Sequence, residues 1–226
     1  MYATGPTDDE DVEAREPVLD TVDRVSELCF GLFMALTFVG AVSAVTAGED
    51  AGRKMFYTAL GCNLAWGLAD AVMFLIRTVT NRARRLTLAS TVKSEPDAAA
   101  GVRALRDALP RWIKPLIADT ELELIRARLA AVTALPHRPR LVRNDFIGAV
   151  GIFLIVVFST FPVALPFILF RDVPTALIVS RALTLAMLFA SGVALGRHAG
   201  YGGWKTGCAM VALGIALTMA IIALGG

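Results

Sequence analysis

Residues 146–170 read FIGAVGIFLIVVFSTFPVALPFILF, a stretch without a single charged side chain. An apolar helix of about 20 residues is long enough to cross the roughly 30 Å hydrocarbon core of a bilayer. Four other stretches have the same character, and only two charged side chains, Asp70 and Arg181, fall inside them. They cover residues 28–47, 55–76, 173–196 and 206–226. The sequence therefore predicts five membrane-spanning segments.

The spanning segments are expected to be helices, because their apolar residues follow one another instead of alternating at every second position, as barrel strands do. We therefore expect an all-α polytopic membrane protein with five transmembrane helices and a cytoplasmic helical insertion between the second and third. The division is an acidic cytoplasmic tail (1–27), helices one and two (28–76), a connector (77–145) and helices three to five (146–226).

Composition excludes several other classes of protein. The 226 residues are 56% hydrophobic and 19% charged, whereas a soluble domain has about 25% charged residues. The three cysteines have no CxxC spacing, so neither a disulfide framework nor a zinc site is indicated. A net charge of +2 is too small to indicate a nucleic-acid partner. The lipid bilayer is the partner that the composition predicts.

The distribution of basic residues predicts the orientation. The connector holds 14 of the 22 Lys and Arg residues, and cytoplasmic loops are enriched in these residues. The first 27 residues hold nine acids and two arginines, which is the opposite of a basic signal peptide. We expect a cytoplasmic N-terminus and a C-terminus on the opposite side, in a bacterial inner membrane.

The connector has the pattern of a small helical arm. Residues 82–100 are polar and are expected to be loose around Glu95 and Pro96. Apolar residues at helical spacing follow, and Thr120 with Glu123 predicts a capping box at the start of a second helix.

Asp70 is the leading candidate for a functional residue, because an ionisable group inside a bilayer costs several kcal/mol. Asn63, Trp66 and Met73 stand at helical spacing from it and are expected to form one stripe. Carboxylate and amide oxygens suit hard or borderline cations, and a thioether suits softer ones. Asp70 either binds a transported cation, pairs with Arg181, or faces a water-filled entrance.

The first span has a weaker parallel. Glu27 marks its cytoplasmic edge, and Met34 and Thr37 are expected on the same face. Glu27 is either a second ion-pathway carboxylate or a solvated interfacial residue. Met34 is either a soft donor or packing filler.

Three further residues are assigned structural roles. Arg181 is expected to be a structural intramembrane charge, either the counter-ion of Asp70 or a snorkelling residue. Pro162 and Pro166 remove two backbone donors and predict a helix kink, with Ser159 and Thr160 satisfying the freed carbonyls.

No pattern of an enzyme is found in the sequence. It contains no GxxxxGK[ST] loop, and its two histidines, His137 and His198, are isolated. We therefore expect no catalytic residues, no enzymatic activity and no resident cofactor, with a divalent metal ion as the transported substrate.

The chain resembles the vacuolar iron transporter (VIT) family in its plan and in local motifs. It carries Asp23-Arg24 before Phe30-Gly31-Leu32, a third span ending FPVALPF at residues 161–167, and two final spans rich in small residues. The resemblance implies a homodimer of five-span chains. It also implies a carrier that moves Fe²⁺ or Mn²⁺ out of the cytoplasm in exchange for protons.

The departures from the family matter for the site. The family's intramembrane aspartate of the first span aligns with Phe30, and Glu27 lies about one turn earlier. Asp70 and Met73 are the nearest equivalents of the family's second-span acid and methionine. The alternative is a non-transporting scaffold or regulator that keeps the VIT-like fold.

Overall fold

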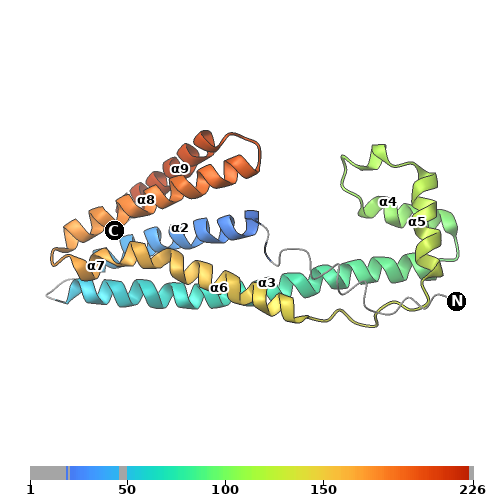
Figure 1. The fold of residues 1–226 in the computed structure, drawn as a ribbon, viewed down its shortest axis with the longest axis horizontal. Helices are drawn as coiled ribbons and strands as arrows, with labels where there is room; N and C mark the ends of the chain where they lie inside the picture. Colours follow the sequence, from blue (N-terminus) through green and yellow to red (C-terminus); the bar gives the residue numbers. More distant parts are fainter. Residues whose placement is uncertain (1–18, 20, 46–49, 224–226) are drawn as a thin grey trace. The chain divides into compact units, whose positions relative to one another are not determined.

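The computed structural model describes residues 19, 21–45 and 50–223, and within them it is helical with no strand. Figure 1 traces the chain. The helices are α2 (Thr21–Val45), α3 (Ala51–Ser94), α4 (Ala98–Ala108), α5 (Asp119–Ala131), α6 (Arg143–Ala164), α7 (Pro166–Leu169), α8 (Val173–His198) and α9 (Gly203–Ala223), with a short 3₁₀ turn at Lys114–Leu116. The chain forms two compact units. The arm comprises residues 75–142, and the bundle comprises the described residues before and after the arm.

Within the described residues, five helical segments are long and apolar enough to cross a membrane, as expected. They are Val22–Val42, Ala51–Ser94, Arg143–Leu169, Val173–His198 and Gly203–Ala223. This composition is compatible with a membrane protein.

The second of these helices is longer than the sequence suggested. The chain leaves the helix around Glu95 and Pro96, as expected, but the polar residues before this point are not loose, because α3 continues unbroken to Ser94. Residues 82–94 contain neither Gly nor Pro, so nothing in them stops a helix. Only Glu95–Asp97 leaves the helical conformation, because Pro96 disfavours helical geometry in the residue before it.

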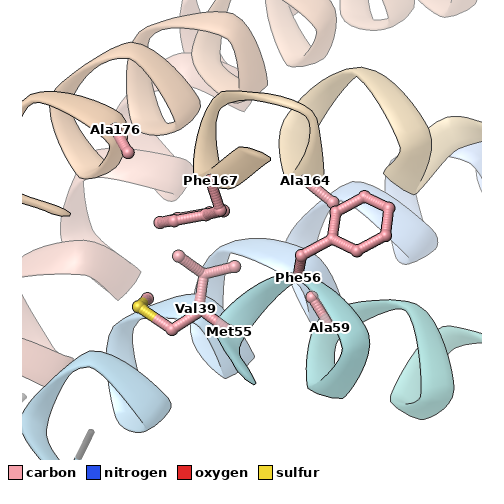
Figure 2. Close-up of a cluster of buried hydrophobic side chains, with 7 residues drawn as sticks. All are labelled: Val39, Met55, Phe56, Ala59, Ala164, Phe167 and Ala176. Atoms are coloured by element: carbon pink, nitrogen blue, oxygen red, sulfur yellow. The ribbon is translucent and has the colours of Figure 1, made fainter. Parts of the chain in front are cut away.

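Helix α2 lies at the centre of the bundle and contacts α6, α8 and α9. One buried cluster joins it to α3, α6, α7 and α8, as Figure 2 shows. Its members are Val39, Met55, Phe56, Ala59, Ala164, Phe167 and Ala176. A second cluster joins α2 to α6 and α8 through Leu32, Val163 and Leu188. The core of the bundle is therefore apolar along most of α2.

The third span is interrupted at its second proline. Helix α6 contains Pro162 and ends at Ala164, and α7 begins at Pro166. The expected role of the neighbouring hydroxyls is wrong. Ser159 Oγ and Thr160 Oγ1 both donate to the carbonyl of Val156, at 2.8 and 3.1 Å, whereas Pro162 frees the carbonyl four residues before it. These short side chains bond back within their own turn.

Helices α8 and α9 approach each other closely. A Cβ atom on Gly192 would lie 2.9 Å from the Cα of Gly207 and 2.9 Å from the carbonyl oxygen of Thr206. Glycine lets two helix backbones come together where a side chain would hold them apart.

In the arm, α4 packs against α5, and the start of α5 differs from the predicted capping box. The N-cap is Ala118, whose backbone N–H donates to Glu121 Oε2 at 2.8 Å. Glu123 instead accepts from Arg126 Nε at 2.8 Å. The helix begins one residue earlier than Thr120, so Glu121 takes the third helical position, from which a carboxylate reaches back to the cap.

Arg106 organises the loop before α5. Its guanidinium donates to the carbonyls of Lys114 and Ile117, at 2.9 and 3.0 Å, and to the Asp119 carboxylate. One charged side chain thus holds three points of the turn between α4 and α5.

Candidate ion pathway

Asn63 is the most informative polar residue of the bundle. Its side chain is only 1% exposed, and neither its amide nitrogen nor its amide oxygen has a hydrogen-bond partner among the described residues. One turn further along α3, a Cβ atom on Gly67 would lie 3.2 Å from the carbonyl oxygen of Phe153. This face of α3 therefore packs directly on α6. Buried polar groups in proteins are nearly always paired, so an unpaired amide marks a site for a ligand or an ordered water.

Asp70 lies two turns beyond Asn63 on the same side of α3. Seven residues of an α-helix turn through almost two full circles, so the two side chains differ in direction by only about 20°. Asp70 is half-buried, and its carboxylate oxygen Oδ2 is inaccessible to solvent. The carboxylate and the amide therefore share one side of the helix.

The predicted four-residue stripe is divided by the structure. Trp66 and Met73 are 40% and 49% exposed, whereas Asn63 is buried. Met73 is rotated from Asn63 by about 80° around α3, because ten residues do not complete a whole number of turns. Its thioether therefore belongs to the outer surface of a single bundle, and Asn63 belongs to the interior.

The register between α2 and α3 follows from two contacts. The rings of Phe30 and Trp66 meet edge to face, with centroids 6.0 Å apart, and Val39 packs with Met55 in the buried cluster. From Val39 to Phe30 the chain of α2 goes back nine residues, whereas from Met55 to Trp66 the chain of α3 goes forward eleven. The two helices therefore run antiparallel.

This register places the remaining candidates at two levels, meaning two depths along the axes of α2 and α3. Glu27 stands about one turn before Phe30, and Asp70 about one turn after Trp66, so the two carboxylates lie at the same level. By the same count, Met34 lies at the level of Asn63. Both Glu27 and Met34 are half-buried. The hydroxyl of Thr37 donates to the carbonyls of Phe33 and Met34 in its own helix.

Phe30 lies between the two levels. Its ring is 40% exposed and meets Trp66 at an interplanar angle of 75°. An edge-to-face pair of this kind contributes about 0.5–1.5 kcal/mol beyond the area that it buries. Position 30 thus holds an aromatic contact.

Arg181 has no direct bond to Asp70 among the residues that the structure describes. No hydrogen bond or ion pair joins the two in the described part of the chain, and Arg181 Nε is buried without a hydrogen-bond partner there. The neighbouring Ser180 bridges α8 to α6 by donating to the Val163 carbonyl at 2.7 Å. That neutral hydrogen bond provides an interhelical link of the kind expected from a charge pair.

Sequence reasoning missed Asp145. It was assigned to the end of the connector, but it lies in the first turn of α6 and is only 7% exposed. The available signal was its place directly before a long apolar run, because an acid in the first turn of a helix is favoured by the helix dipole.

The described ionisable side chains of one chain do not form a complete metal shell. No group of three or more His, Cys, Asp or Glu side chains in the described ranges could hold a metal ion. Asn63 and Asp70 are separated by about 10 Å along α3, whereas a ligand oxygen lies about 2.0–2.6 Å from its metal. Asn63 and Asp70 of one chain are therefore too far apart along the helix to bind the same ion directly.

Among known protein families none matches this chain, and no curated protein is significantly similar to it.

Proposed function

We propose that this chain is a VIT-like carrier of divalent cations such as Fe²⁺ or Mn²⁺, which it moves out of the cytoplasm by proton exchange. The observation on which the proposal rests is the Asn63 amide, buried to 1% exposure with both polar atoms unpaired in the described residues. A transient ligand on a transport path is one state that would satisfy such a group. The alternative is a permanently unsatisfied amide, which lowers the stability of the folded protein because its lost contacts with water are not replaced by hydrogen bonds.

The two levels give the pathway its chemistry. At the first level of the candidate path, which lies nearer the cytoplasmic edge, Asp70 and Glu27 offer carboxylates. Carboxylate oxygens are the ligands that hard and borderline divalent cations prefer. At the next level, Asn63 offers an amide oxygen and Met34 a thioether. A cation that binds the carboxylates displaces their protons, and the protons rebind when the cation leaves. This exchange couples the cation to a counter-flow of protons.

A homodimer would complete the coordination. One chain offers two carboxylates at the first level, fewer than the six or more ligands of a hard cation. The exposed Met73 side chain would then contribute its sulfur from the outer face of α3 towards the second copy. In this proposal the N-terminus is cytoplasmic and the membrane is a bacterial inner membrane.

A specific observation favours a second function, a scaffold or regulator with a VIT-like fold that does not transport. Phe30 fills the level between the two pairs of candidate ligands with a ring packed on Trp66. An apolar plug of this kind would interrupt an ion path. It would also stabilise the packing of α2 on α3.

The test is metal flux into liposomes that contain the purified chain, with Fe²⁺ and Mn²⁺, with and without a pH gradient. Asp70→Asn is expected to reduce flux at least tenfold, because it removes the exchangeable proton and keeps the side-chain shape. Asp107→Asn, an exposed acid of the arm, is the matched control and is expected to leave flux unchanged. Undiminished flux in Asp70→Asn would refute the pathway. Absence of flux in a folded wild-type protein would favour the scaffold.

A further inference from the structure

The charges of the arm are segregated along the chain. No acid occurs between Asp70 and Glu95, and none between Glu123 and Asp145, yet these two acid-free stretches hold most of the arm's arginines. All acids of the arm fall between residues 95 and 123. The two stretches are the ones that adjoin the apolar part of α3 and the start of α6 in sequence.

Ion pairs neutralise the part of the arm that contains the acids. Each pair joins a cation to Asp97, the residue before α4, or to an acid of α4 or α5. The pairs are Arg103–Asp97, Arg106–Asp119, Lys114–Asp107 and Arg126–Glu123. The local charge in this region is therefore largely balanced.

A backbone contact brings the two acid-free stretches together. Arg82 Nη1 donates to the carbonyl oxygen of Arg140 at 2.8 Å. The chain at Arg140 therefore lies against the turn of α3 that also carries Arg84 and Arg85. Arg84, Arg85, Arg138 and Arg140 are exposed, and none forms an ion pair with any described residue. These four residues are called the arginine patch.

We propose that the arginine patch binds the phosphate headgroups of anionic phospholipids. A guanidinium presents a planar fork of donors that matches a phosphate in two-point contact, and it is weakly hydrated for a cation. Arginine clusters directly next to a membrane-spanning helix meet lipid phosphates at the headgroup level. The inference rests on the membrane placement of the bundle, and it is independent of whether the chain transports an ion.

The binding is tested with the full chain, purified in a neutral detergent and titrated with phosphatidylglycerol or phosphatidylcholine. Native mass spectrometry counts the lipids retained. The wild type is expected to retain phosphatidylglycerol in preference to phosphatidylcholine, and the preference should weaken as salt shortens the screening length. An arginine near an anionic surface contributes about fivefold in affinity. The patch variant, Arg84→Gln, Arg85→Gln, Arg138→Gln and Arg140→Gln combined, is therefore expected to lose at least tenfold.

A matched control removes the same charge from elsewhere in the arm, by changing Arg103, Arg111, Lys114 and Arg128 to Gln. It is expected to keep the preference. Replacing the four patch residues by Lys keeps the charge but loses the two-point phosphate contact, so it should retain more binding than the Gln variant and less than the wild type, which separates a charge effect from misfolding. Equal losses in the patch and control variants would overturn the proposal.

One other outcome would assign the patch to a different partner. Residues 1–18 carry six acids and one arginine. If phosphatidylglycerol binds in preference only after these residues are deleted, the patch is occupied by the chain's own acidic segment and the lipid proposal is wrong.

Discussion

Replacing Asn63 with Leu should make the protein more stable, although it removes a polar residue from a candidate pathway. Leu has the same branching at Cγ as Asn, so it fills the same space with two methyl groups in place of the amide nitrogen and oxygen. Both amide atoms are buried without partners in the described residues. A buried unsatisfied polar group costs about 1–3 kcal/mol, and Leu relieves that cost. For a chain of this size, about 1–3 kcal/mol corresponds to a rise in Tm of about 2–12 °C.

The assay is thermal unfolding of the purified chain in detergent, followed by circular dichroism, with Ser180→Ala as the matched variant. Ser180 is also buried, but its hydroxyl donates to the Val163 carbonyl at 2.7 Å. Its loss leaves that carbonyl unpaired and should lower the stability by about 1–2 kcal/mol. The two substitutions therefore have opposite signs. A fall in Tm for Asn63→Leu would refute the reasoning, because it would mean that the amide is satisfied by a partner such as a bound water.

Two other predictions concern helix packing and charge. Gly192→Leu should destabilise the bundle by about 1–3 kcal/mol and separate α8 from α9, because its Cβ would lie 2.9 Å from the Cα of Gly207. Loss of the monodisperse peak in size-exclusion chromatography measures this. The Arg126 guanidinium lowers the pKa of Glu123 by hydrogen bonding to it. Because the folded-state pKa is the lower one, the pair stabilises α5 above the unfolded pKa, and this contribution is lost as the pH falls through the folded pKa. NMR titration should find the Glu123 pKa closer to its ordinary value in Arg126→Gln; an unchanged pKa would contradict the assignment.

The two candidate functions differ in what Phe30 does. In a carrier, the ring must move aside for each ion, so the contact with Trp66 has to break during transport. In a scaffold, the contact is permanent. Phe30→Ala is informative under either reading, because it removes an aromatic pair and opens the level between the carboxylates and the Asn63 amide.

Much of the fold follows from local properties of the sequence. A run of about 20 apolar residues forms a helix of spanning length wherever it stands, so the five segments can be recognised without knowing their neighbours. The helix at Val102 and Leu105 follows in the same way from the spacing of its apolar residues. Asp70 and Asn63 could be singled out because polar side chains are rare in such segments.

Which face of each helix is buried was decided only by the tertiary structure. A spanning helix is apolar on all sides, so its pattern holds no sign of the direction in which its neighbours lie. That is why Met73 and Asn63 looked alike in sequence, although one is exposed and the other is buried. It is also why Phe30 could be located against Trp66, and Arg181 away from any ion pair with Asp70, only once the helices had packed. Hydrogen bonds between distant segments, such as that from Ser180 to Val163, depend on the same packing.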